Sequence, residues 1–498
     1  MRMRKQSVSH VFSLFFAGVA ICLVLGSIAW AQPALVQLSQ DTFNDAPSQH
    51  ATEVEPGSFT YGNTIVTAFQ VARIYSGGGA DIGFATSTNG GQTWTNGYLP
   101  GITIYQGGGS YSAASDASVA YDAMHGVWLV STLPIGNNGN AVAVSRSADG
   151  LNWSNPVFVT TSGGPDKNWI ACDNTPTSPY YGHCYQEWDS TNAGDLMQMS
   201  TSTDGGQTWG PVLRTQGSDY GIGGLPLVQL KGKVVVPFLG FSGSVMAFSS
   251  TNGGKSWTKA IAIGSFINHA EAGDIRSAGL PSAAIDKKGK IWVAWSDCRF
   301  RTSCAENDIV YSRSANGTKW TAVKRVPIDV VSSTVDHFIT GMAIDPNTAG
   351  AKTHVGLAYY YYPVSNCGNN CSLNVGFIQS SSNGKTWSAP QTLGGPMQLT
   401  WLPDTFSGRM VADYIAVAFG GGKAFPIFAL ALAPVGSLYQ EAIYTTSAGL
   451  EADAPELEYL TSAYDEPVPD AHSDHGPMEY LDQEHLIPVK GQRPPESD

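Results

Sequence analysis

Charged side chains are scarce in this sequence, and several of them recur at equivalent positions just before short apolar runs. Only 13% of the 498 residues are Asp, Glu, Lys or Arg. Charges gathered at equivalent positions could bind an anionic ligand or transfer protons, because guanidinium groups pair with carboxylates and carboxyl, imidazole and phenol groups act as acids or bases. The residues that we single out at these positions are Asp116, Lys167, Glu271, Arg276, Asp336, His337, Arg409 and Tyr414.

Anion binding is the chemistry that we expect from the cations of this set. Arg276 and Arg409 are the preferred carboxylate clamps, since the planar guanidinium fork binds a carboxylate through two parallel hydrogen bonds. The complete substrate-binding set that we predict is Asp116, Lys167, Arg276, Arg299 and Arg409.

Proton transfer or nucleophilic attack is expected from the remaining groups. We predict Glu271, Asp336, His337 and Tyr414 as the catalytic candidates, and the sequence supports no order among them. The structural alternative is that these charges line a channel and bind only water and neighbouring backbone.

Six of the seven cysteines lie in three close pairs, and the seventh, Cys22, lies in the apolar N-terminal stretch. An even number of cysteines in an exported chain indicates disulfides, whereas no histidines stand at zinc-ligand spacing beside them. We therefore predict no metal and no cofactor, and disulfides that join Cys172 to Cys184, Cys298 to Cys304 and Cys367 to Cys371. The middle loop, "DCRFRTSC", would present Arg299 and Arg301 to an anionic sugar, or would be a staple at a blade edge whose arginines pair with Asp297 or Glu306.

A repeated phrase shows which elements must position these residues. "STNGGQTW" at residue 87 returns in related form at 147, 202, 250, 314 and 381, and the final tryptophans are 48 to 67 residues apart. Short β-branched and aromatic runs bounded by Gly, Asn, Asp and Pro surround each copy, which predicts four strands per repeat. In each copy, the third residue, Asn or Asp, should cap the turn, and the tryptophan should fill space between strands. In the last copy, "SSNGKTW", that residue is Asn383.

This repeat pattern predicts an all-β fold, a β-propeller of four-stranded blades. Six copies mark six blades, and strand-like runs after the last copy could form another blade. The run "ALVQLSQ" near the N-terminus would supply its fourth strand and close the ring. We therefore favour seven blades, with six blades as the alternative.

The pattern S-x-D/N-x-G-x-x-W resembles the Asp-box, or BNR repeat, of sialidases and sialidase-like propellers, including bacterial secreted sialidase-like proteins. Such a resemblance implies a six-bladed propeller in which three arginines bind a carboxylate and a tyrosine, a glutamate and an aspartate carry out hydrolysis. The sequence departs from that pattern because an arginine-isoleucine-proline motif is missing before the first copy. The loop "IYSGGG" also lacks the expected aspartate.

The resemblance favours a glycoside hydrolase that acts on an anionic or decorated extracellular glycan. A polysaccharide lyase and a non-catalytic glycan-binding propeller remain alternatives, because one scaffold can host many functions.

The two ends of the chain differ in composition from the body. Residues 1–31 have a basic start, an apolar stretch and the end "AWA", which predict a signal peptide cleaved after Ala31. Residues 32–450 form the predicted propeller, and residues 451–498, with 13 acidic residues against Lys490 and Arg493, form an acidic, Pro-rich tail that we expect to be disordered. We expect a monomer outside the cytoplasm, secreted or periplasmic, without nucleic-acid partners and without a membrane anchor after cleavage.

Overall fold

The computed structural model describes residues 32–452 and 456–457; the predicted signal peptide and nearly all of the predicted tail lie outside these residues. Residues from Pro33 onward form one unit, and the description below is of that unit. Its described part consists of strands, turns and five three-residue 3-10 segments, with no α-helix. Within the same residues, no helix has the length and apolarity needed to cross a membrane.

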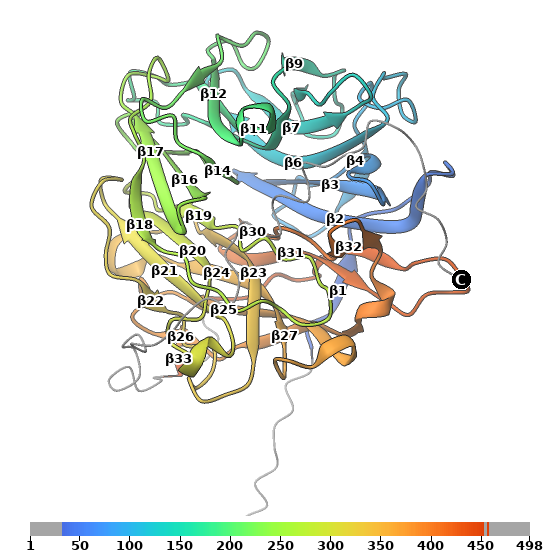
Figure 1. Cartoon of the computed structure of the whole chain (residues 1–498). Helices are drawn as coiled ribbons and strands as arrows, with labels where there is room; N and C mark the ends of the chain where they lie inside the picture. Colours follow the sequence, from blue (N-terminus) through green and yellow to red (C-terminus); the bar gives the residue numbers. More distant parts are fainter. Residues whose placement is uncertain (1–31, 453–455, 458–498) are drawn as a thin grey trace, which may run out of the picture. The chain divides into compact units, whose positions relative to one another are not determined.

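The strands form antiparallel groups of four that follow the order of the chain (Figure 1). The first group is β2 (Ser48–Tyr61), β3 (Thr64–Ile74), β4 (Gly79–Ser87) and β5 (Thr95–Tyr98). The next is β6 (Ala113–Asp122), β7 (Val127–Ile135), β8 (Val142–Ser147) and β9 (Val157–Thr160). It is followed by β10 (Pro165–Cys172), β11 (Cys184–Ser190), β12 (Leu196–Ser202) and β13 (Leu213–Arg214).

The middle of the chain repeats this plan, with an interrupted first strand in one group. That group is β14 (Gly221–Ile222) and β15 (Leu227–Val228), which both pair with β16 (Val234–Gly240), then β17 (Ser244–Ser250) and β18 (Ile261–Ser265). The next is β19 (Ser282–Ile285), β20 (Ile291–Asp297), β21 (Asp308–Ser314) and β22 (Lys324–Arg325).

The C-terminal part adds two further groups. One is β23 (Asp336–Ile344), β24 (Val355–Tyr362), β25 (Ser372–Ser380) and β27 (Gln391–Gln398). The other is β30 (Ala416–Gly420), β31 (Lys423–Ala431), β32 (Glu441–Thr446) and the N-terminal β1 (Leu35–Gln37). Short pairings lie outside the groups and join β26 (Trp387–Ser388) to β33 (Glu456–Leu457) and β28 (Asp404–Thr405) to β29 (Gly408–Arg409).

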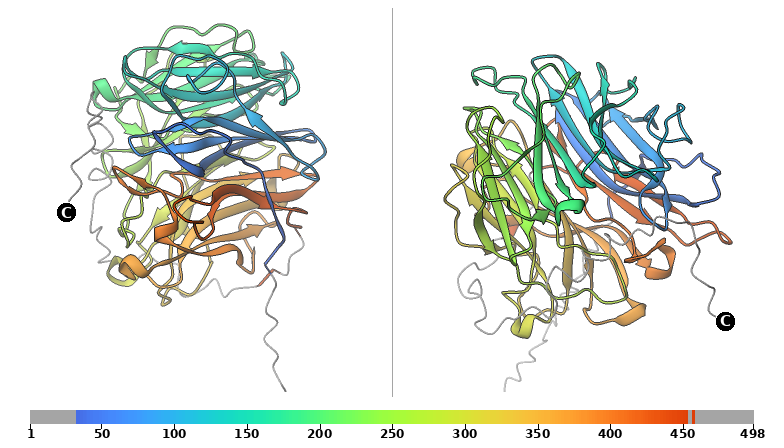
Figure 2. Two further views of the ribbon diagram at one scale, coloured as in Figure 1. Left: turned by 90° about the vertical axis from the view of Figure 1, so that its right-hand side faces the viewer. Right: turned by 45° about the horizontal axis from the view of Figure 1, so that its top comes forward.

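The first strand of each group contacts the first strand of the next. β2 contacts β6, β6 contacts β10, β10 contacts β15, and the series continues through β19, β23 and β30 back to β2. Figures 1 and 2 show the groups succeeding one another around the centre of this unit. Radially arranged four-stranded sheets whose first strands meet at a common axis are the architecture of a β-propeller. The all-β fold predicted from the repeats is thus confirmed, and the arrangement of the groups fits the predicted β-propeller.

The repeated phrases form capped turns, as predicted. In the first copy, Asn89 Oδ1 accepts a hydrogen bond from the Thr93 N–H (3.0 Å), and Ser87 Oγ accepts one from the Gly91 N–H (2.8 Å). The equivalent capping side chains in the next four copies are Asp149, Asp204, Asn252 and Asn316. Hydrogen bonds from the Asn152 and Leu151 N–H groups hold the pKa of Asp149 well below its usual range.

The sixth copy corrects the sequence alignment by one residue. Ser382 Oγ, not Asn383, accepts the hydrogen bond from the Thr386 N–H (2.8 Å). Asn383 instead occupies the left-handed region, with φ of 62°, a conformation that asparagine tolerates better than most residues.

The six tryptophans pack where they were predicted to pack, and each contacts a different hydrophobic cluster. Trp257 and Trp387 are 1% and 4% exposed, and the other four lie partly buried at the edges of their clusters. The tryptophan therefore ties each turn to the apolar space beside it, which explains why so large a side chain follows a glycine-rich turn.

Candidate functional site

Four of the innermost strands share a backbone feature that turns one side chain toward the axis. β6, β10 and β23 each contain a register shift and β2 contains two; the residues with positive φ at these shifts are Ala51 (57°) and Glu55 (58°) in β2, Asp116 (49°), Lys167 (45°) and Ile339 (45°). A β-bulge inserts an extra residue and re-aims its side chain. Equivalent bulges in successive blades therefore place three charged groups at one level of the axis.

These three groups meet in a buried ionic cluster that Arg276 and Asp413 complete. Lys167 Nζ lies 2.7 Å from Asp413 Oδ2, 3.2 Å from Asp116 Oδ1 and 3.5 Å from Glu55 Oε1. Arg276 donates to both oxygens of Asp413, with 2.7 Å between Nε and Oδ1. All five residues are at most 8% exposed. We call these five residues the axial cluster.

Proton binding by Glu55 reduces the repulsion among the carboxyl groups of the axial cluster. Burial raises the pKa of Glu55 to about 8, against the opposing attraction of Lys167, so this carboxyl group is largely protonated at pH 7. Burial would also raise the pKa of Asp413, but Arg276 and Lys167 outweigh it and hold that pKa well below its usual range. Asp413 is therefore the charged partner of both cations.

The two predicted carboxylate clamps lie on adjacent backbone segments but differ in availability. The Arg276 N–H donates to the Arg409 carbonyl oxygen (2.8 Å), and the Arg409 N–H donates to the Asp274 carbonyl oxygen (2.7 Å). The Arg276 fork is already paired with Asp413. Arg409 donates from Nη1 to the Gly273 carbonyl (2.9 Å) and keeps 23% of its side chain exposed. Of these two arginines, Arg409 is the one that can reach a ligand in this conformation.

Glu271 and Asp336 are hydrogen-bonded to the same residue, Asn307. Asn307 Nδ2 donates to Glu271 Oε1 (3.1 Å), and its backbone N–H donates to Asp336 Oδ1 (2.7 Å). Burial raises the pKa of Asp336 to about 7. Burial and, next, the Asp336 charge raise the pKa of Glu271 well above its usual range. Asp336 is fully buried, whereas Glu271 is partly exposed, so Glu271 is the member of the pair that a ligand can contact.

His337 belongs to a neighbouring buried network. Its side chain is 1% exposed, and its Nδ1 lies 3.2 Å from the Asn307 carbonyl oxygen. Burial lowers the pKa of His337. Ligand atoms of His337, Asp308 and Asp329 lie within 4.8 Å of one another, but Arg301 pairs with both aspartates, at 2.6 and 2.8 Å. Because this guanidinium already neutralises the carboxylates, the three residues are poorly suited to a cation.

The arginines of the "DCRFRTSC" loop are paired within the protein, as in the second interpretation above, but Arg301 pairs with Asp308 and Asp329 and not with Asp297 or Glu306. Nε and Nη2 of Arg299 each lie 2.7 Å from an oxygen of Asp297, and Nη2 also donates to the Ser265 carbonyl. The guanidinium of Arg299 is paired within the protein, which argues against the predicted contact with a sugar.

The three predicted disulfides are confirmed: Cys172–Cys184, Cys298–Cys304 and Cys367–Cys371.

Tyr414 lies beside the axial cluster. Lys167 Nζ is 5.2 Å from the centre of the Tyr414 ring, and Trp169 meets that ring edge to face at 5.2 Å. The Tyr414 hydroxyl is buried and has no hydrogen-bond partner within the described part of the chain. Burial raises the pKa of this phenol well above its usual value.

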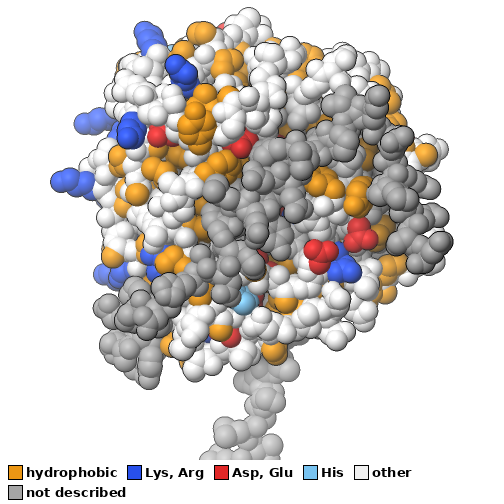
Figure 3. Space-filling model, in the orientation of Figure 1, with side chains coloured by type: hydrophobic (Ala, Val, Ile, Leu, Met, Phe, Trp, Pro, Cys, Tyr) orange, Lys and Arg blue, Asp and Glu red, His pale blue; other side chains and the backbone are white. Residues whose placement is uncertain are grey.

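Asn307 is the residue of this site that sequence reasoning missed. It precedes β21, which is not an innermost strand, so the rule that selects residues before innermost strands passes over it. Glu55 and Asp413, two members of the axial cluster, are also absent from the predicted site residues. On the face shown in Figure 3, the Lys and Arg side chains of the described residues lie mainly along one edge, over β17 to β22, and not in a continuous patch.

Several solved structures are similar to this chain. No protein-family model matches the sequence, and no curated protein matches it. A leech intramolecular trans-sialidase is 11% identical over 66% of this chain and 68% of its own, with a TM-score of 0.43. The NanB sialidase of Streptococcus pneumoniae, as the K499G mutant, is 15% identical over 85% and 71%, with a TM-score of 0.42. A Dyadobacter fermentans protein of unknown function is 14% identical over 70% and 98%, with a TM-score of 0.45.

Proposed function

We propose that this protein is an extracytoplasmic glycoside hydrolase that acts on an anionic or decorated glycan. The observation that carries the proposal is the Glu271–Asp336 pair bridged by Asn307, with the partly exposed Arg409 on the adjoining segment. Glycosidases need a carboxyl group that stays protonated near neutral pH and can give its proton to the leaving oxygen. The resemblance of the repeated turns to Asp-boxes points to the same class of substrate.

Glu271 acts as the general acid in this proposal. Its proton passes to the glycosidic oxygen as the bond from that oxygen to the anomeric carbon breaks, and water adds its hydroxyl to the carbon and releases a proton. Asp336, which is too buried to touch a glycan, is a positioning residue that keeps Glu271 protonated. Arg409 binds the anionic group of the sugar. His337 and Tyr414, the other predicted catalytic candidates, are buried and have no assigned step.

The test is a screen of the purified full-length protein against a panel of anionic polysaccharides and sialylated oligosaccharides. Released reducing ends indicate hydrolysis, and ultraviolet absorbance of an unsaturated uronate indicates a lyase. If a substrate is found, Glu271→Gln should lower kcat at least 100-fold, the lower range for loss of general acid catalysis. Asp274→Asn, on the same loop but exposed, is the matched control and should retain activity. Unaltered turnover in Glu271→Gln would remove Glu271 from the mechanism.

Glycan binding without turnover is the second candidate, and the axial cluster favours it. The charged groups of Lys167 and Arg276 are committed to Asp413, which suits a rigid scaffold more than a reacting centre. Retention on a glycan array with no product in either assay would identify this function. Neither candidate calls for a cofactor or a nucleic acid.

We further propose that the propeller has seven blades and that β1 closes the ring. The pairing of β1 with β32, Leu35 opposite Thr446, supports closure because the N-terminal strand completes the four-stranded group begun by β30. Export through a cleaved signal peptide is supported by the three disulfides, which persist in oxidising compartments. N-terminal sequencing of the secreted protein should begin at Gln32.

A further inference from the structure

A cavity of about 470 Å³ lies on the axis of the propeller, next to the axial cluster. Asp116, Lys167 and Tyr414 line one end of it. The other lining residues lie on the innermost strands or in the segments beside them, and those on β2, β6, β10 and β23 come after the bulges described above. Glu271 and Arg409, which precede innermost strands, do not line it. The cavity is thus separate from the proposed glycan site.

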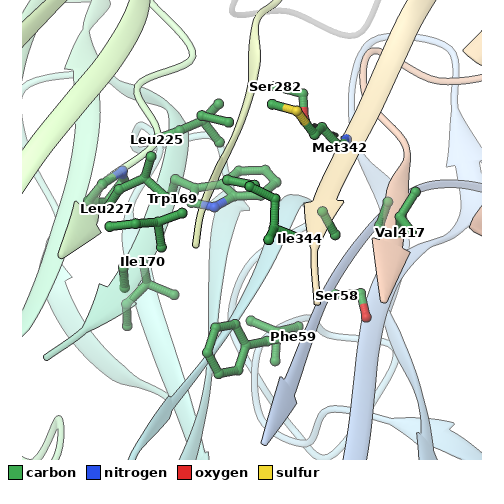
Figure 4. Close-up of a pocket in the computed structure, with 18 of the residues that line it drawn as sticks. Ser58, Phe59, Trp169, Ile170, Leu225, Leu227, Ser282, Met342, Ile344 and Val417 are labelled. Atoms are coloured by element: carbon green, nitrogen blue, oxygen red, sulfur yellow. Dashed lines mark hydrogen bonds between the residues drawn. The ribbon is translucent and has the colours of Figure 1, made fainter. Parts of the chain in front are cut away.

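The walls of the cavity are predominantly apolar. Figure 4 shows side chains from several innermost strands surrounding one space, among them Phe59, Trp169, Leu227, Met342, Ile344 and Val417. These six residues come from β2, β10, β15, β23 and β30. A volume of 470 Å³ falls within the range of about 300–1,000 Å³ that is typical of pockets for small molecules.

Most polar side chains at the walls are bonded within the protein, and three buried side-chain atoms there have no partner in the described part of the chain: Thr60 Oγ1, Asn168 Oδ1 and the Tyr414 hydroxyl. Ser58 Oγ donates to the Val66 carbonyl oxygen, and Ser282 Oγ accepts from the Met342 N–H. Lys167 and Asp116 are bonded to each other. The Tyr414 hydroxyl is buried at this end without a partner. A buried hydroxyl without a hydrogen bond is unfavourable, so an oxygen acceptor placed beside it would be stabilised.

We propose that this cavity binds one small, mainly apolar molecule whose single oxygen acceptor takes a hydrogen bond from the Tyr414 hydroxyl. Aromatic or aliphatic ketones and esters are the chemical class that fits. Water satisfies the apolar part of this space poorly, because a buried water needs two to four polar partners and side chains such as Leu227, Ile344 and Val417 offer none. A sugar fits poorly for the same reason, since its many hydroxyls would lose hydrogen bonds to solvent.

The experiment uses the full chain and the neutral fluorophore N-phenyl-1-naphthylamine, whose emission rises when it leaves water. We expect saturable binding at one site per chain. Two competitors of nearly equal shape, 2-acetylnaphthalene and 2-ethylnaphthalene, then test the acceptor, because only the first carries a carbonyl. The ketone should displace the probe at concentrations at least threefold lower than the hydrocarbon, and Tyr414→Phe should abolish that preference. Absence of probe binding, or equal competition in the unmodified protein, would overturn the proposal.

Filling the cavity supplies the second test. Ile344→Trp should weaken probe binding at least tenfold, whereas Ile261→Trp, the same change at an exposed position of β18, should leave it unaltered. Melting temperatures of both variants establish that they fold, and Met342→Phe is the milder replacement if Ile344→Trp does not. Unchanged affinity in a folded cavity variant would place the probe elsewhere and refute the assignment. Ile344 does not belong to the proposed glycan site. Glycan turnover should therefore persist in Ile344→Trp even where probe binding is lost.

Discussion

Replacement of Lys167 by methionine should destabilise the protein by about 3 kcal/mol, the lower part of the range for removal of one partner from a buried ion pair. Lys167 is 6% exposed and contacts carboxyl groups from three blades. The loss is not three times that of a single pair, because Asp413 retains Arg276 and Glu55 is largely protonated at pH 7. Asp116 is the group left with an uncompensated charge.

Equilibrium unfolding in urea, followed by tryptophan fluorescence, measures this change without adding the ions of guanidinium. Lys423→Met is the matched control, because Lys423 pairs with Glu451 at 2.7 Å but both side chains are more than a third exposed. Such a surface pair contributes about 0–1 kcal/mol. The double variant Lys167→Met with Asp116→Asn should recover part of the lost stability, since it removes the unpaired charge.

A loss of stability in Lys167→Met no larger than that in Lys423→Met would contradict this prediction. A further loss of stability when Asp116→Asn is added to Lys167→Met would contradict it too, because Asp116 would then be stabilised by a group other than Lys167.

Other perturbations test separate parts of the structure. Stability should fall as the pH rises from about 5 to 8, because burial raises the pKa of Glu53 in the folded protein from 4.5 to about 8. In this range the folded protein holds a proton that the unfolded chain has released, so each rise in pH favours the unfolded chain. The urea midpoint of unfolding should therefore vary less with pH in Glu53→Gln. Asn316→Ala should cost about 1–2 kcal/mol of unfolding free energy without altering ligand binding, since Asn316 Oδ1 accepts two backbone hydrogen bonds. Removal of residues 33–42 should lower the melting temperature strongly, because it strips β1 from β32. Deletion of residues 455–498 should leave the melting temperature nearly unchanged, since in the described structure that segment contributes one two-residue pairing.

The repeated turns could be predicted from the sequence because the information in them is local. A capping side chain, a glycine with positive φ and a tryptophan lie within eight residues, so their spacing alone determines the hydrogen bonds. The single correction, Ser382 in place of Asn383, has a local cause too. Serine can accept the same backbone hydrogen bond with its hydroxyl oxygen, and a search for Asn or Asp passes over it.

The partners of the charged residues could not be predicted in the same way. Position before an innermost strand indicates that Asp116 and Lys167 approach the axis, but bulges decide which atoms meet there. Asp413 precedes β30, the innermost strand of another group. Its carboxylate already binds the guanidinium of Arg276, which we predicted to bind a ligand. Pairing across blades depends on how far each strand is displaced along the axis, and no short stretch of sequence records that displacement.

Arg276 links the two regions of the axis to which we assign separate roles. Its side chain is part of the axial cluster, and its backbone N–H holds the carbonyl of Arg409, the proposed anion clamp. Asp413 holds the guanidinium of Arg276 through two hydrogen bonds. The backbone hydrogen bond from Arg276 to Arg409 then also holds β29, the strand that carries Arg409. Two residues of the axial cluster, Asp116 and Lys167, also line the apolar cavity. The axial cluster therefore lies between the proposed polar site and the apolar cavity, and this position offers a reason why a chain with so few ionisable side chains buries five of them together.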